Sequence, residues 1–408
     1  MIIDAVGGWQ YPALGDICDV RDGTHDSPKY VEVGFPLITS KNLTEDGLCF
    51  EKVSYITQED HDAIEKRSAV SDGDILYGMI GTVGNPVIVK KDRDFSVKNV
   101  AIFKFLEESL IFNKYLFYVL NGDFVTRQIS KESKGGTQKF VSLKVLRGLK
   151  IPLPPLETQK QIVAVLEKAD QLRKDCKLLE QELNSLAQSV FIDMFGDPVT
   201  NPKGWKSASL EKYLLNGPTN GLYKHADSYG SGAPIIRIDG FYNGKLNNIN
   251  TFKRVEVTEI ELNRYKIDNR GILINRVNSP QYLGKAAFID GIIEDTVYES
   301  NMMYLTVDES RLNSRYLVSL LASQLVKSQI KNCSKDAVNQ SSINQKDVKS
   351  FQILIPDIEL QNRYERFLLK LDCQLQSLNK YLVELEMQFN SLMQKAFSGE
   401  LKLDNAKN

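Results

Sequence analysis

Residues 162–190 read IVAVLEKADQLRKDCKLLEQELNSLAQSV, and residues 368–396 read LLKLDCQLQSLNKYLVELEMQFNSLMQKA. In both stretches, apolar or small side chains recur at alternating spacings of three and four residues over four heptads, which is the pattern of a coiled-coil helix. At 1.5 Å per residue, a helix of this kind that includes the flanking turns is about 60 Å long. The predicted stripes are Ile162, Val165, Ala169, Leu172, Cys176, Leu179, Leu183, Leu186 and Val190, and Leu368, Leu371, Leu375, Leu378, Leu382, Leu385, Phe389, Leu392 and Ala396.

Each stripe needs an apolar partner. Because the two stripes occupy related places in one chain, the simplest arrangement pairs them with each other. The contacts of a two-fold pair are isologous, so we expect the helices to run antiparallel. Packing of each stripe against its own globular domain is the alternative interpretation.

The stripes belong to a repeat that covers the whole chain. Gly8-Trp9 recurs as Gly204-Trp205, and Asn99, Gln159 and Phe195 recur 202 residues later as Asn301, Gln361 and Phe397. The offset is 196 residues at the start of the chain and settles near 202 further on, which indicates two homologous halves with a few insertions in loops, and hence pseudo-two-fold symmetry within one chain.

Each half begins with about 150 residues of mixed character. Short β-rich runs such as GFPLITS (34–40) and APIIRID (233–239) are separated by Gly and Pro, and helical stretches are expected near 113–130 and 313–331. The predicted fold class is α+β, with two repeated domains joined by two long antiparallel coiled-coil helices. The predicted boundaries are 1–154 and 198–356 for the two domains, and 155–197 and 357–404 for the helical segments.

The composition excludes several classes of protein. The 408 residues include 51 Lys and Arg and 52 Asp and Glu, five cysteines without a C-x-x-C pair and three widely separated histidines. This cysteine usage fits a reducing cytoplasm, and no metal site is expected. No stretch has the roughly 18 apolar residues of a membrane span, so we expect a cytoplasmic protein that does not enter a membrane.

Motifs for catalysis are absent from the sequence. There is no G-x-x-x-x-G-K-[ST] phosphate loop, and no N/D-P-P-Y/F tetrapeptide of the kind a base methyltransferase uses. We expect this chain to catalyse nothing by itself.

The formal net charge of -1 conceals two basic segments. Between Arg127 and Lys150 there are seven basic residues and one acid, and between Arg311 and Lys349 there are seven basic residues and two acids. Both segments surround a polar loop, at 135–140 and 337–342. Lys and Arg bind phosphates, and Gln, Asn, Arg and Ser/Thr read base edges. The recurrence of such a loop in both halves favours contact with DNA.

Two strings then suggest a family. IPLPPLETQKQIV (151–163) before the first long helix, and MFGDPVTNPKGW (194–205) at the start of the second half, resemble the specificity (S) subunit of Type I restriction–modification systems. DGTHDSPKY (22–30) and GDILYGMIGTVG (73–84) are looser matches, and ILIPDIELQNRYE (353–365) departs from the pattern by losing one Pro. The resemblance covers essentially the whole chain.

This resemblance implies a division of labour. Two target-recognition domains would each read one half of a bipartite site in double-stranded DNA, and the helices would set the gap between the half-sites. Two modification (methyltransferase) subunits would carry S-adenosylmethionine, and restriction (translocase/nuclease) subunits would use ATP and Mg, so this chain would hold no cofactor. A specificity subunit of a fused nuclease–methylase system, and a coiled-coil scaffold that does not bind DNA, are the alternatives.

The candidate DNA-binding residues lie in the matched motifs and the polar loops. Any of them could instead cap a turn or a helix, and Tyr77 and Tyr223 are left open between stacking on bases and packing in a core. The candidates are Thr24, Lys29, Thr39, Lys41, Asn42, Thr82, Lys98, Asn99, Thr137, Gln138 and Lys139 in the first half, and Lys224, Arg237, Asp239, Arg276, Asn278, Ser279, Asn301, Asn339, Gln340 and Ser341 in the second.

Overall fold

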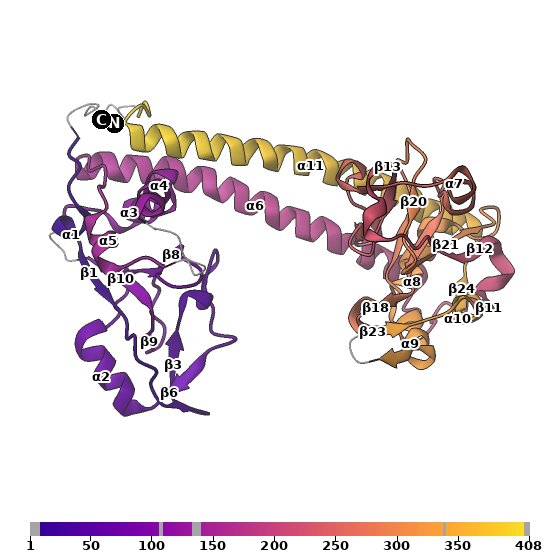
Figure 1. The fold of residues 1–408 in the computed structure, drawn as a ribbon, viewed down its shortest axis with the longest axis horizontal. Coiled ribbons are helices and arrows are strands. Elements are labelled where there is room, and N and C mark those ends of the chain that lie inside the picture. The colour runs from indigo at the N-terminus through magenta and orange to yellow at the C-terminus, as the bar shows by residue number, and fades with distance from the viewer. Residues whose placement is uncertain (1–8, 106–108, 133–139, 338–339, 404–408) are drawn as a thin grey trace. The chain divides into compact units, whose positions relative to one another are not determined.

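The computed structural model describes residues 9–105, 109–132, 140–337 and 340–403 (Figure 1). The chain forms two compact units, Met1–Lys177 with Lys380–Asn408, and Leu178–Asn379. Each unit contains one α+β domain, part of the long helix α6 (Leu156–Phe195) and part of the long helix α11 (Ile358–Ser398). The predicted fold class is therefore confirmed, and both helices lie inside the segments predicted for them.

The domain of the first unit contains two four-stranded sheets. One has the antiparallel order β1-β10-β7-β8, and the other has the order β2-β6-β3-β9, in which β3 and β9 are parallel. Its elements are α1 (Leu14–Ile17), β1 (Asp19–Asp22), β2 (Tyr30–Val31), β3 (Phe35–Ile38), β4 (Leu43–Thr44), β5 (Gly47–Leu48), β6 (Ser54–Ile56), α2 (Gln58–Ser68), β7 (Ile75–Gly78), β8 (Gly84–Ile88), β9 (Ser96–Val97), β10 (Val100–Lys104), α3 (Asn113–Asn121), α4 (Asp123–Glu132) and α5 (Leu143–Gly148).

The domain of the second unit repeats this topology with additions. The order β12-β21-β17-β19 corresponds to β1-β10-β7-β8 and continues into β15 and β14, and the parallel pair β13–β20 corresponds to β3–β9. Its elements are β11 (Lys206–Ser209), β12 (Leu214–Asn220), β13 (Tyr229–Ile236), β14 (Phe241–Tyr242), β15 (Lys245–Leu246), β16 (Lys253–Val255), α7 (Glu259–Tyr265), β17 (Ile272–Asn275), β18 (Val277–Asn278), β19 (Ala286–Phe288), β20 (Val297–Tyr298), β21 (Met302–Val307), α8 (Ser314–Leu321), α9 (Gln324–Cys333), β22 (Lys335–Ala337), β23 (Gln340–Ser342), α10 (Gln345–Ser350) and β24 (Gln352–Ile355).

The two helical stretches expected at 113–130 and 313–331 are each two helices. Gly122 ends α3 before α4 begins, and Ser323 lies between α8 and α9 with extended backbone angles. An extended residue interrupts the helical hydrogen-bond ladder, although the apolar spacing continues across it.

A buried glutamine joins each domain to its long helix. The side chain of Gln159 accepts a hydrogen bond from Phe112 N at 2.8 Å and donates to Leu110 O and Pro154 O, both at 2.9 Å. Gln361 accepts from Asn313 N at 2.8 Å and donates to Pro356 O at 2.7 Å. Both side chains are fully buried. The repeated Gln therefore satisfies backbone groups at the start of α3 or α8 and ties them to α6 or α11.

The long helices pair antiparallel within each unit. In the first unit the Arg173 guanidinium lies 4.4 Å from the centroid of the Phe389 ring, and Lys177 approaches Glu386 at 4.0 Å. In the second unit the Tyr364 hydroxyl donates to Ala187 O at 3.2 Å. As residue numbers increase along α6, the numbers of the residues that they contact on α11 decrease. The predicted antiparallel pair is therefore confirmed.

The predicted stripe is correct for α11 and half correct for α6. On α6, Val165, Leu172, Leu179 and Leu186 are between 37% and 45% exposed. The inner face instead uses the positions one residue further on, including Leu166 and Arg173. Alternating steps of three and four residues can start from either neighbour, and the aliphatic stem of Arg173 substitutes for an apolar side chain because its charged end lies over an aromatic ring.

We expect Gln159→Ala to lower the free energy of unfolding by about 2 kcal/mol, because it leaves buried backbone N–H and C=O groups without partners. Gln171→Ala is the matched control, since Gln171 lies on the same helix, is exposed and bonds only to Asp175. Urea denaturation of the full chain measures both. Equal stabilities for the two variants would contradict the structural role given to Gln159.

Candidate nucleic-acid interface

In the first unit, four candidate residues from three separate sequence regions come together. Thr24 follows β1, Thr39 follows β3, and Lys98 and Asn99 follow β9, which is parallel to β3. Thr24 and Lys98 form a parallel β-bridge, and Lys98 Nζ donates to Ser27 Oγ at 2.7 Å. The carboxyl ends of two parallel strands and the end of a third strand therefore present these residues together.

A histidine beside this group favours its charged form. His25 Nδ1 lies 2.9 Å from Asn99 Oδ1, and Nε2 lies 2.8 Å from Asp22 Oδ2. Hydrogen bonds to Asn99 and then to Asp22 raise the pKa of His25. Both ring nitrogens therefore face an acceptor oxygen, which stabilises the protonated imidazole relative to the neutral one.

The second unit builds the same arrangement with different side chains. Leu222 follows β12 and bridges Glu299, which follows β20, while Arg237 follows β13. The Arg237 Nε donates to Glu299 Oε2 at 3.3 Å, and Ile238 N donates to Glu299 Oε1 at 2.7 Å. Lys224 Nζ donates to Glu261 Oε2 at 2.8 Å. The repeat therefore preserves the place of these loops and changes their chemistry.

A glycine permits the close approach of these loops in both units. A Cβ atom at Gly23 would lie 2.2 Å from Val97 O, and a Cβ atom at Gly221 would lie 2.3 Å from Glu299 O. No other residue fits at such distances without moving the backbone. Both glycines come directly before the residue that forms the parallel bridge, Thr24 or Leu222.

A cavity of about 400 Å³ opens at the site in the second unit. Three cationic side chains and one carboxylate line it, and two of the cations are paired, Lys224 with Glu261 and Arg237 with Glu299. Tyr223, left open in the sequence, is 77% exposed beside the cavity, whereas Tyr77 is 4% exposed in the core of the first unit. The lining residues are Leu222, Tyr223, Lys224, Ala226, Tyr229, Arg237, Lys253, Glu299, Ser300 and Asn301.

The residues directly after the two polar loops, Val141 and Ile343, are hydrogen-bonded next to these sites. Arg276 N donates to Asn301 O at 2.9 Å, and Ile343 N donates to Arg276 O at 2.9 Å, directly after β23. The first unit has equivalent bonds from Met79 N to Asn99 O and from Val141 N to Met79 O. Thr137, Gln138, Lys139 and Asn339 lie outside the described residues.

Several other candidates serve the fold or stand apart. Asn42 and Ser341 are 5% and 2% exposed. Asn42 donates to Cys49 O and Lys52 O and accepts from Thr39, so it holds its own loop. The Arg276 guanidinium donates to Ser300 O and braces that loop. Ser279 precedes a short 3-10 helix beside Asn278. The exposed candidates outside the two groups are Lys29, Lys41, Thr82, Asp239 and Gln340.

Sequence reasoning missed Glu299, Lys253 and the contribution of Tyr223. The second half has one residue more, YESN (298–301) in place of VKN (97–99). A sequence alignment at a constant offset therefore does not place Glu299 opposite Lys98. The backbone bonds Lys98 N to Ile38 O and Glu299 N to Ile236 O establish that these two residues correspond.

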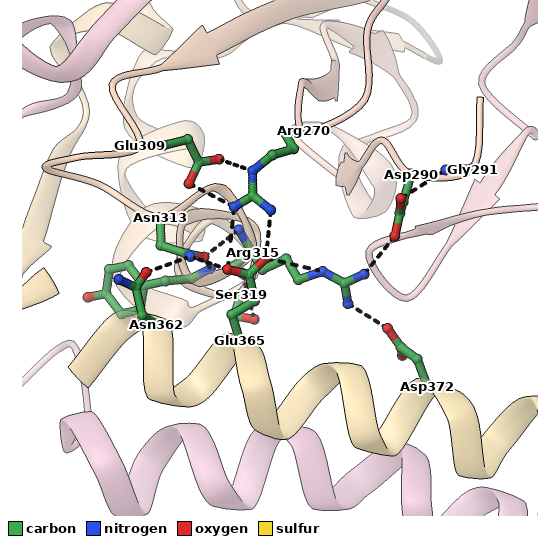
Figure 2. Close-up of polar contacts among 11 residues, drawn as sticks. Arg270, Asp290, Gly291, Glu309, Asn313, Arg315, Ser319, Asn362, Glu365 and Asp372 are labelled. Carbon is green, nitrogen blue, oxygen red and sulfur yellow. Dashed lines mark hydrogen bonds and ion pairs between the residues drawn. The ribbon is translucent and has the colours of Figure 1, made fainter. Parts of the chain in front are cut away.

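A polar network fixes the second domain to α11 (Figure 2). Arg315, whose side chain is 9% exposed, pairs with Asp372 and, at 3.0 Å, with Asp290. Arg270 pairs with Glu309 at 2.8 Å and with Glu365 at 2.9 Å. Lys114 corresponds to Arg315 in the first unit, because each lies two residues after the backbone N–H that its buried Gln binds. Among the described residues, the ammonium group of Lys114 pairs with Glu167, and both side chains of this pair are exposed.

Burial opposes ionisation of Glu365, but hydrogen bonds from Arg270 and Asn313 outweigh it and lower the pKa of this carboxyl. A lowered pKa in the folded state stabilises the fold above the unfolded value of about 4.3. This contribution is lost as the pH falls through the lower, folded value.

We expect Arg315→Ala to destabilise the protein by about 2 kcal/mol, because it removes the partner of Asp290 and one of the two cationic partners of the partly buried Asp372, which keeps Lys245. Lys114→Ala, at the corresponding place in the first unit, should change stability by less than about 1 kcal/mol because its ion pair is exposed. Thermal unfolding of the full chain at pH 7 compares the two. A loss from Lys114→Ala as large as that from Arg315→Ala would contradict this difference.

Two further findings concern metal ligands and membrane spans. Among the described residues, no group of three or more His, Cys, Asp or Glu side chains could hold a metal ion. No helix in the described ranges is both long and apolar enough to cross a membrane.

The geometry defines a duplicated module that presents polar loops beside a long helix, and comparison with known proteins gives it a family. The model of the Type I restriction modification DNA specificity domain matches residues 7–187 and 216–387. The chain belongs to this family.

Individual proteins with similar sequences, and solved structures with a similar fold, agree with this family assignment. The chain is 25% identical over 312 residues to the EcoKI specificity subunit of Escherichia coli K12, covering 72% of this chain and 67% of that protein. It is 22% identical to the MjaVIII specificity subunit of Methanocaldococcus jannaschii, covering 97% and 94%. The putative MjaX specificity subunit of the same organism is 28% identical, and the match spans about half of its length (46%). A solved chain from a type I R-M system has the same fold, with a TM-score of 0.60 at 18% identity, covering 98% of this chain and all of that one. The S subunit from M. genitalium has a TM-score of 0.54 at 14% identity, covering 97% of this chain and 98% of that one.

Proposed function

We propose that this chain is the DNA sequence-specificity subunit of a Type I restriction–modification complex. The observation that carries the proposal is the repeated site: in both units the ends of two parallel strands and a Gly-containing loop gather polar and cationic side chains. Each recognition domain reads one half of a bipartite site, because each unit has its own copy of the interface. Polar loops set on a rigid sheet are suited to reading base edges in the major groove.

The two half-sites differ in sequence. The corresponding positions hold Thr24 and Leu222, Thr39 and Arg237, and Lys98 and Glu299. The corresponding side chains differ in their hydrogen-bond donors, in their acceptors and in their charge. The two domains therefore cannot favour the same bases. The site read by the complex is therefore asymmetric.

The paired helices set the gap between the half-sites. Both are about 40 residues long, which is about 60 Å at 1.5 Å per residue and exceeds the 34–36 Å between half-sites one helical turn apart.

Partner subunits supply the chemistry. The exposed apolar side chains of α6 form a partly exposed apolar face, in which Val165 is 37% and Leu172 is 45% exposed. Such a face is typical of a protein interface. Two modification subunits dock on the helices and bind S-adenosylmethionine, and restriction subunits bring ATP and Mg; this chain supplies the address.

We expect methylome sequencing of a host that expresses this chain with its modification partner to reveal a bipartite motif with an unread gap. A matched insertion of seven residues in α6 and α11 adds about 10 Å. It should lengthen the gap by about three base pairs while the specified bases stay the same. A single continuous motif, or a gap that does not change, would sink this proposal.

We expect the double variant Val165→Glu with Leu172→Glu to lose at least tenfold in affinity for the modification subunit without loss of stability, because both side chains face solvent in the isolated chain. Gln161→Glu with Gln171→Glu, at exposed neutral residues of the same stretch of α6, changes the net charge by the same amount and serves as the control. Co-purification and titration of the modification subunit provide the readout. Equal losses from both pairs would mean that charge, and not the apolar face, controls docking.

A further inference from the structure

The guanidinium of Arg237 is hydrogen-bonded through its Nε, while, among the described residues, its two terminal nitrogens are not. Its Nε is bonded to Glu299, and Glu299 is itself fixed by the backbone N–H of Ile238. The Glu299 side chain is 12% exposed and that of Arg237 is 37% exposed. Within the part of the chain that the structure describes, neither terminal nitrogen of Arg237 has a hydrogen-bond partner. Arg237 lines the cavity of the second unit.

An oriented pair of N–H donors needs two acceptors side by side. In double-stranded DNA, guanine offers O6 and N7 at the major-groove edge, and a phosphate offers two oxygens. The choice between these two ligands depends on the local charge.

The carboxylate of Glu299 decides against a phosphate. It neutralises the Arg237 guanidinium from the protein side, and its own negative charge repels a phosphate brought to the same place. A neutral base edge meets no such repulsion and still receives both donors. Lys253 lines the same cavity, is exposed and has no partner among the described residues, so it is better placed to bind a phosphate.

The first unit lacks this pair. The corresponding residues are Thr39, which bonds to Asn42, and Lys98, which bonds to Ser27. Neither can present two parallel donors in a fixed plane. The arrangement is therefore a property of the second recognition domain alone.

We propose that Arg237 reads a guanine in the half-site bound by the second recognition domain, and that Glu299 is the positioning residue that aims its guanidinium. This inference rests on the proposed function of the chain and adds the base and the two residues that select it.

The first test uses methylome sequencing of the complex with Arg237→Gln and, separately, Glu299→Gln. Both should make one guanine position of one half-site degenerate and leave the other half-site unchanged. If Glu299 were merely structural, its loss would lower methylation at all sites without changing the motif. Arg254→Gln is the control, since Arg254 is an exposed arginine of the same domain, pairs with Glu294 and lies outside the cavity lining.

The second test uses the wild-type complex, so it does not depend on how a variant folds. Duplexes carrying 7-deazaguanine at one guanine of the motif at a time lack the N7 acceptor. We expect a single position, the one that becomes degenerate in Arg237→Gln, to lose about tenfold in affinity, as one bidentate contact is worth about 1–3 kcal/mol.

Three results would overturn the inference while leaving the proposed function intact: a bipartite motif with no guanine in either half-site, a motif unchanged by Arg237→Gln, or a uniform loss of affinity with a salt slope lower by about one, which indicates a phosphate contact. If the wild-type complex gives no bipartite motif, the proposed function fails and this inference fails with it.

Discussion

The architecture depends on a hydrogen-bonded glutamine at the start of each long helix. Gln159 and Gln361 are fully buried, and each satisfies the first backbone N–H of a domain helix and a carbonyl that precedes a long helix. A carbonyl or N–H group left unpaired at this depth costs more than any neighbouring apolar contact returns. The joint therefore has one geometry, and a recognition domain cannot rotate freely on the helix that carries it.

The second unit reinforces this joint with charge. Arg315 on α8 and Arg270 on a loop of the domain pair with four carboxylates, of which Glu365 and Asp372 belong to α11. At the corresponding place in the first unit, the described residues form the exposed pair of Lys114 and Glu167. The two halves thus share a joint made by backbone groups and differ in the side chains around it, as they also do at the recognition loops.

Much of this could be predicted from the sequence because the chain contains the same pattern twice. The repeat of Gln159 and Gln361, the heptads of α11 and the antiparallel pairing all follow from periodicity and symmetry. The inner face of α6 could not be predicted in this way. The apolar spacing predicts that Leu172 faces inward, but the aliphatic stem of Arg173 takes that place. The partnership of Arg237 with Glu299 was also invisible, since it depends on a parallel strand pair that brings residues 62 apart into contact. Residues buried for local reasons, such as Asn42, are of the same polar types as the residues proposed to face DNA, so the sequence alone does not separate them.

The partners of the two glutamines have a consequence for how such proteins change. Every hydrogen bond that these side chains make is to a main-chain atom. Main-chain atoms keep their positions in any substitution that preserves the backbone. The joint therefore places almost no requirement on which amino acids the attached domain contains. Recombination within a gene could exchange one recognition domain for another of the same fold, and the new domain would be seated correctly at once. A new DNA address would then arise in a single genetic event, without any compensating change in the helices.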